Sequence, residues 1–102
     1  MSKGSGEAVD LNELCSITLL PVETIYTIVE LGIIEPEGNV PEQWRFTTAM
    51  IATTRRAMRL HCDLDIDWPG IALALSLIDE LEKLRESNRC LQQRLQRFVE
   101  SN

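Results

Sequence analysis

The chain has 102 residues, and 16 Asp and Glu residues outnumber 10 Lys and Arg residues, for a formal net charge of −6. The length suits one domain with a modest core plus one extended element, and the hydrophobic share of 44% is typical of a folded protein. The acidic balance argues against nucleic acid as a default partner, because DNA binding needs Lys and Arg set against phosphates.

Three cysteines, Cys15, Cys62 and Cys90, are widely spaced and form no C-x-x-C pair. An odd number at wide spacing fits neither a disulfide framework nor a metal site, so we expect three reduced, structural thiols in a cytoplasmic protein. No apolar run approaches the roughly 18 residues of a membrane-spanning helix. Residues 1–8 carry no secretory signal pattern, and we expect them to be flexible.

Residues 9–66 are predicted to form a helical head. Its first helix is expected over residues 9–16, where Asp10 can act as the N-cap and Glu13 completes a capping box. A tight connection over residues 16–20 then leads to the second helix.

Pro21 is predicted to be the first residue of that second helix, where its missing N–H costs nothing. The helix is expected to reach about Leu31, and Gly32 supplies a left-handed stop. Apolar residues recur along it at spacings of three and four, which indicates one buried face. These residues are Val22, Ile25, Ile28 and Val29.

Residues 33–46 are predicted to form a small β hairpin, or wing, because turn-forming residues interrupt two apolar stretches. The turn formers are Pro36, Gly38, Asn39 and Pro41. A third helix is expected to begin at a cap supplied by Thr47 or Thr48 and to run to about Cys62. The break that follows is expected over residues 63–66.

The last helix is predicted over residues 67–99, with Asp67 as its N-cap and Phe98 near its end, and residues 100–102 form a tail. Its apolar residues alternate at spacings of four and three, which is the heptad pattern of a coiled coil. The core positions of this pattern are Leu77, Leu81, Leu84, Asn88, Leu91, Leu95 and Phe98. The chain has no second long helix to cover them, so we expect a homodimer.

The residues from Gly4 to Trp44 include eight acidic residues and no Lys, Arg or His. This stretch contains both helices of the predicted helix-turn-helix and most of the wing. A recognition helix for DNA needs Arg, Lys, Asn or Gln to reach bases and phosphates. The head is therefore predicted to bind a basic protein, although a solvated acidic surface remains the alternative.

Five segments resemble known families. The segment 31–36 is similar to the end of the second helix in MerR-type regulators, and the segment 44–47 resembles their wing strand. The segments 55–60, 64–75 and 88–99 resemble the chaperone-modulator family CbpM, whose head is itself MerR-like. The resemblance covers essentially residues 9–99 and implies an all-α fold: a MerR-like winged helix-turn-helix head with a small β wing, followed by a long C-terminal coiled-coil helix.

The CbpM resemblance implies a non-catalytic adaptor that binds the J-domain of the co-chaperone CbpA and blocks its action with the Hsp70 chaperone DnaK. J-domains of this class present a basic second helix, which an acidic head complements. The expected contact surface combines acids of the head with the stretch from Asp63 to Trp68. Its candidate residues are Glu23, Glu30, Glu35, Asp63, Asp65, Asp67 and Trp68.

The orientation of the predicted coiled coil stays open. Asn88 at a core position is typical of parallel dimers, whereas the resemblance to MerR-type proteins implies an antiparallel pair. Trp44 is expected to belong to the core more than to an interface. For Trp68 the two roles are equally expected, because a residue at the start of a helix is often half exposed.

Two other functions remain as alternatives. A DNA-binding regulator of the MerR kind would have to use Arg45, Arg55, Arg56 and Arg59, the available basic residues of the head. We expect instead that Arg55, Arg56 and Arg59 pair with Asp63, Asp65 or Glu35, or lie solvated, and exposed pairs of this kind contribute only about 0–1 kcal/mol each. A coiled-coil scaffold would leave the head dispensable for binding. His61 has no partner at metal-ligand spacing, and no nucleophile–base pair or phosphate loop is present, so neither catalysis nor a metal or other cofactor is expected.

Overall fold

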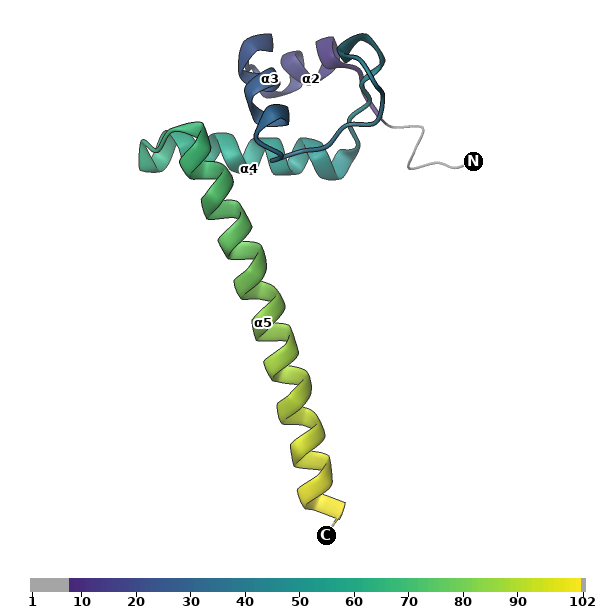
Figure 1. Ribbon diagram of the computed structural model, residues 1–102, viewed down its shortest axis with the longest axis vertical. Coiled ribbons are helices and arrows are strands. Elements are labelled where there is room, and N and C mark those ends of the chain that lie inside the picture. The colour runs from purple at the N-terminus through teal and green to yellow at the C-terminus, as the bar shows by residue number, and fades with distance from the viewer. Residues whose placement is uncertain (1–7, 102) are drawn as a thin grey trace. The chain divides into compact units, whose positions relative to one another are not determined.

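The computed structural model describes residues 8–101 and contains four α-helices and one short 3-10 helix within them (Figure 1). The helices are α2 (Leu11–Thr18), α3 (Val22–Glu30), η1 (Pro41–Gln43), α4 (Thr48–Leu64) and α5 (Trp68–Ser101). The all-α fold with a long C-terminal helix is confirmed. The flexible start expected over residues 1–8 lies outside the described residues except for Ala8, and so does Asn102 of the expected tail.

The chain divides into two compact units, one ending at Ala72 and the other beginning at Leu73. We call the first unit the head. The division falls inside α5 because Ile71, in the first turn of this helix, is fully buried within the head. The domain boundary predicted between residues 66 and 67 stays a prediction.

Helix α2 begins with the predicted capping box. The Asp10 carboxylate accepts a hydrogen bond from the Glu13 backbone N–H at 2.9 Å, and the Asp10 N–H donates to the Glu13 carboxylate at 3.0 Å. The helix starts and ends two residues later than predicted. Val9 lies outside it and pairs in an antiparallel bridge with Phe46, and Leu19 ends the helix in the left-handed conformation.

Helix α3 follows with Pro21 as its N-cap. Gly32 adopts a φ of +78°, as predicted for the stop, and the next residue, Ile33, donates its N–H back to the Ile28 carbonyl at 3.1 Å. Ile25 and Ile28 are completely buried, which confirms the predicted apolar face. Helix α2 contacts both α3 and α4.

The predicted wing contains no strand in the part of the chain that the structure describes. Residues 33–46 form a loop that is closed by one antiparallel bridge between Glu37 and Arg45, with backbone N···O distances of 3.3 and 3.0 Å. Proline lacks the N–H that a ladder needs, and Pro41 starts the 3-10 helix η1 instead. Gly38 has a φ of +114°, and a Cβ there would lie 2.5 Å from the Gln43 carbonyl oxygen.

Helix α4 is capped by Thr47, whose hydroxyl accepts a hydrogen bond from the Met50 N–H at 3.2 Å. The predicted end at Cys62 is wrong by two residues. The helix continues to Leu64, and the chain turns at Asp65, which is left-handed with a φ of +53°. Helix α5 then extends to Ser101, since no Gly or Pro follows Gly70.

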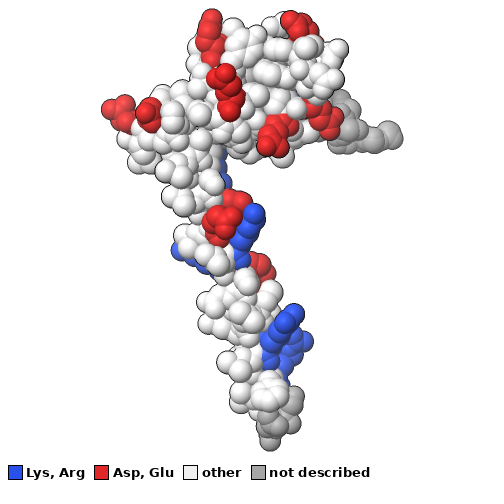
Figure 2. All heavy atoms as spheres, viewed as in Figure 1, with Lys and Arg blue, Asp and Glu red and all other residues white. Residues whose placement is uncertain are grey.

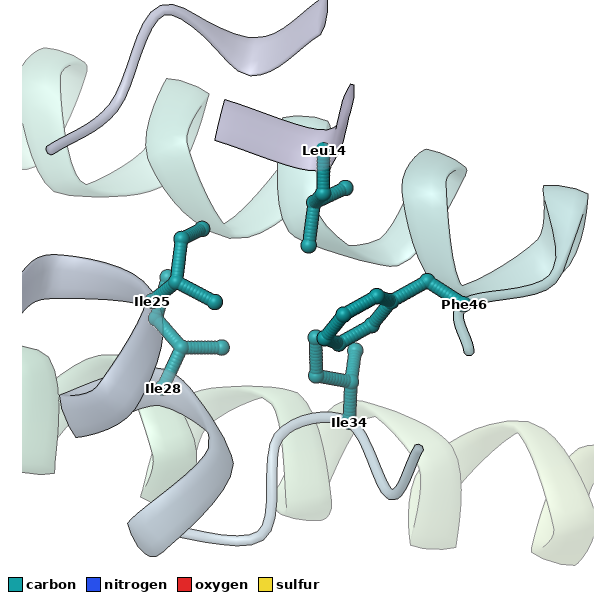
Figure 3. Close-up of a cluster of buried hydrophobic side chains, with 5 residues drawn as sticks. All are labelled: Leu14, Ile25, Ile28, Ile34 and Phe46. Carbon is teal, nitrogen blue, oxygen red and sulfur yellow. The ribbon is translucent and has the colours of Figure 1, made fainter. Parts of the chain in front are cut away.

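The core of the head lies between α2, α3, the loop after α3 and the start of α4 (Figure 3). Its buried side chains are Leu14, Ile25, Ile28, Ile34 and Phe46. Two backbone hydrogen bonds, of 2.8 and 2.9 Å, join Phe46 to Val9. They hold the end of the wing loop against the residues that precede α2. The opposite face of α3, which carries Glu23, Tyr26 and Glu30, is exposed.

Candidate interaction surfaces

The outer face of α3 carries two of the predicted contact residues. Glu23 and Glu30 are exposed and lie two helical turns apart, so they share one face. Glu35, also exposed, follows in the loop after the helix. These three carboxylates belong to the predicted acidic surface.

None of these carboxylates is neutralised by a base. Within residues 8–101, Glu23, Glu30 and Glu35 form no ion pair, whereas Lys83 pairs with Asp79 and Arg89 with Glu86 along α5. Figure 2 shows Asp and Glu side chains spread over the visible face of the head. The negative charge predicted from the sequence is therefore presented to solvent.

A groove runs beside the outer face of α3. One hollow, of about 380 Å³, is lined by Tyr26, Val29, Glu30, Pro41 and Trp44. An adjoining hollow, of about 360 Å³, shares Tyr26 and Pro41 with it and continues toward the start of α2. We call the two together the α3 groove.

The aromatic residues of the α3 groove are held in place by the core. Tyr26 meets Trp44 edge to face, with ring centroids 5.9 Å apart, and Trp44 meets the buried Phe46 in the same way at 6.1 Å. Trp44 is half-buried and packs against the core, as predicted, but it also lines the groove. Sequence reasoning missed the groove, although an aromatic residue at position 26, off the apolar stripe of α3, was an available signal.

The junction between α4 and α5 holds the other predicted contact residues. Asp63, Asp65 and Asp67 are exposed, and Trp68 is half-buried. Asp67 caps α5, since its carboxylate accepts a hydrogen bond from the Gly70 N–H at 3.0 Å. Four predicted contact residues therefore gather at one turn, separate from the acids of α3.

His61 and Trp68 stack at this junction, with ring centroids 4.3 Å apart and an interplanar angle of 14°. The His61 Nδ1 lies 2.6 Å from the Ile66 carbonyl oxygen. A carbonyl can only accept, so Nδ1 is the protonated ring nitrogen. The stack fixes the Trp68 ring against the end of α4.

The arginines of α4 form a basic surface on the head. Arg55, Arg56 and Arg59 are exposed, and none forms an ion pair with a described residue. The pairing considered for them with Asp63, Asp65 or Glu35 is therefore not found among residues 8–101. Arg45 is also exposed, and its guanidinium donates to the Trp44 carbonyl at 2.8 Å.

The second unit is the part of α5 from Leu73 onward, and its heptad positions are uncovered. The six apolar core residues are between 46% and 68% exposed, and Asn88 is exposed as well. The apolar six are Leu77, Leu81, Leu84, Leu91, Leu95 and Phe98. An exposed apolar stripe at heptad spacing is typical of a helix that pairs with another helix.

All three cysteines are free, but the structural role predicted for them fits Cys15 alone. Cys15 is half-buried, whereas Cys62 and Cys90 are exposed. Burial, and then the nearby Glu23 carboxylate, raise the pKa of the Cys15 thiol. Over residues 8–101, no three His, Cys, Asp or Glu side chains gather as a metal site requires, and no helix is both long and apolar enough to cross a bilayer.

Comparison with known proteins identifies the family. The profile of the MerR HTH family regulatory proteins matches residues 9–93. A Pseudomonas putida protein named chaperone modulatory protein CbpM is 42% identical over 92 residues, which are 90% of this chain and 91% of that protein. A Salmonella paratyphi B protein of the same name is 44% identical over 89 residues, covering 87% and 88% of the two chains. The chain belongs to the CbpM family.

Membership in the CbpM family confirms the resemblance inferred from the sequence segments. A Pseudomonas entomophila CbpM is 41% identical over 92 residues, which are 90% of this chain and 91% of that protein. The family has a MerR-type helix-turn-helix head and is non-catalytic. The acidic surfaces of the head and the exposed apolar stripe of α5 are the candidate interaction surfaces of this CbpM family member.

Proposed function

We propose that the chain is a non-catalytic adaptor that binds the J-domain of a CbpA-type co-chaperone and keeps that co-chaperone from acting with its Hsp70 partner, DnaK. CbpM family membership supports this proposal, because the relatives are named chaperone modulatory proteins. The binding is stoichiometric and needs no cofactor. Its place is the cytoplasm, where three free cysteines remain reduced.

The observation that carries the proposal is the unpaired acidic surface of the head. Exposed carboxylates without basic neighbours attract a cationic partner, accelerate its encounter and orient it. The basic second helix of a J-domain, implied by the family resemblance, has the matching charge. The proposed contacts are Glu23, Glu30, Glu35, Asp63, Asp65, Asp67 and Trp68.

A binding titration against a purified CbpA-type J-domain tests this proposal. Affinity should fall steeply between low and high salt, because the screening length shrinks from about 10 Å at 0.1 M to about 3 Å at 1 M ionic strength. The double variant Glu23→Gln/Glu30→Gln should bind more weakly and show a flatter salt dependence.

The matched control is Glu82→Gln/Glu100→Gln, which removes the same charge from α5. This control should bind like the wild type. Equal affinity at both salt concentrations, or equal losses in the two double variants, would contradict the electrostatic account. Added chain should also lower the J-domain's stimulation of DnaK ATPase activity in proportion to the complex formed.

The alternative function is DNA binding of the MerR kind. The family profile and the exposed arginines of α4 favour it. The same fold brings acids to α3, where a recognition helix would face phosphates, and like charges oppose that approach. A gel shift at low salt separates the two functions, and strong duplex binding would favour DNA.

We further propose that the α5 stripe pairs with a second copy of the chain. The exposed apolar residues at heptad spacing support this, because such residues normally pack against another helix. Sedimentation should give a species of twice 11.6 kDa at micromolar concentration. The variant Leu84→Lys/Leu91→Lys should sediment as a monomer, while Gln93→Lys/Gln96→Lys, with the same added charge outside the core positions, should stay dimeric.

A further inference from the structure

The α3 groove is lined by both apolar and acidic side chains. Tyr26 and Pro41 lie where its two hollows meet. Val29 and Trp44 line one hollow together with Glu30, and Glu42 lines the other. A surface that combines apolar side chains with carboxylates favours a ligand that carries both apolar and positively charged groups.

The apolar part of this groove differs from the scattered apolar residues of an ordinary surface. Single exposed apolar side chains are normal. Here four apolar or aromatic side chains line one hollow: Tyr26 is 40% exposed, and Val29, Pro41 and Trp44 are half-buried. Tyr and Trp are the residues most enriched at the energetic centres of protein interfaces.

The groove is also built before any partner arrives. The edge-to-face chain from Tyr26 through Trp44 to the buried Phe46 ties its wall to the core. A wall held in this way loses little conformational freedom on binding, which favours affinity.

Charge decides what kind of occupant fits. Glu30 and Glu42 are exposed and form no ion pair within residues 8–101, and no base occurs from Gly4 to Trp44. The guanidinium of the adjacent Arg45 is bonded to the Trp44 carbonyl. A second head of this chain would bring carboxylates against carboxylates, so a cationic partner suits the groove better.

We propose that the α3 groove is the docking site for a bulky aliphatic or aromatic side chain that projects from the basic helix of the partner. Basic residues one turn away on that helix face Glu30 and Glu42. This inference rests on the proposed J-domain function and names the part of the head that anchors the partner. An amphipathic helix lying in a groove in this way is a common mode of recognition.

The test measures J-domain affinity of Tyr26→Ala against that of Ile17→Ala. Ile17 is a matched control, because it is 39% exposed, lies on α2 and lines neither hollow of the α3 groove. Tyr26→Ala should weaken binding by about tenfold or more, whereas Ile17→Ala should stay within about twofold. Circular dichroism melts check that both variants fold, and Tyr26→Gln, which keeps a long side chain at an exposed helix position, provides a second variant.

The outcomes separate the groove from the proposed function. If the wild type binds the J-domain and both Tyr26 variants bind it with the same affinity, the α3 groove is not the docking site, while the proposed J-domain binding is retained. No wild-type binding at any salt concentration would overturn both. A Tyr26 variant that changes the sedimenting mass but not J-domain affinity would assign the groove to a second copy of the chain, and would also overturn the inference.

Discussion

Replacing Asp67 by alanine separates the structural role of this residue from its proposed contact with a partner. The Asp67 carboxylate accepts the Gly70 N–H at 3.0 Å, and it lies at the positive end of α5. Alanine removes both effects. Loss of such a cap costs about 0.5–2 kcal/mol, which should lower the melting temperature of a unit of this size by about 4–8 °C for each kcal/mol.

Asparagine at the same position keeps an oxygen that can accept the Gly70 N–H and loses only the charge. Asp67→Asn should therefore lose no more than the charge–dipole part, about 0.3–1 kcal/mol. The assay is thermal unfolding followed by circular dichroism, at one protein concentration for all variants, since association makes the melting temperature depend on concentration.

Two results would refute this reasoning. An unchanged melting temperature in Asp67→Ala would mean that the cap contributes nothing. An equal loss in the asparagine and alanine variants would mean that the charge, and not the hydrogen bond, supports α5. If Asp67→Asn melts like the wild type yet binds the J-domain more weakly, the carboxylate is a contact residue in its own right.

Two further predictions concern the core and a cysteine. Phe46→Ala should destabilise the head by about 3–5 kcal/mol, because this side chain is fully buried. Leu19→Ala, at a position that is 87% exposed, should change the stability by less than about 0.5 kcal/mol. Denaturant titration compares the two variants, and equal losses of stability would contradict the burial argument. Burial and then Glu23 raise the pKa of the Cys15 thiol, so less thiolate is present near pH 8 and iodoacetamide should alkylate Cys15 more slowly than Cys62. Glu23→Gln should lower the pKa of the Cys15 thiol and speed its alkylation. Mass spectrometry of the labelled peptides measures the rate, and an unchanged rate would show that the Glu23 carboxylate does not act on the thiol.

The helices were predictable because their signals are local. Asp10 and Glu13 are three residues apart, and such a pair forms a capping box wherever the following residues are helical. The apolar stripe of α3 and the heptad pattern of α5 follow in the same way from the helical repeat. The predicted ends of the helices were less accurate. Helix α4 ends at Leu64 because Asp65 adopts the left-handed conformation, and the sequence has no glycine there to predict such a turn.

The wing and the groove depended on contacts between distant residues. The sequence predicted a hairpin over residues 33–46, but one bridge between Glu37 and Arg45 closes this loop, because Pro41 starts a 3-10 helix in place of a second ladder. Tyr26 and Trp44 are 18 positions apart along the sequence, and only packing against Phe46 brings their rings together. Periodicity carries no information on such pairs.

The sequence by itself determined the helical class, the family and the sign of the charge on the head, because each depends on residue types and their spacing along the chain. Only the tertiary structure decided which carboxylates stay unpaired and which aromatic rings border a groove. Those properties depend on distances through space, which folding sets when the loop after α3 packs onto the core.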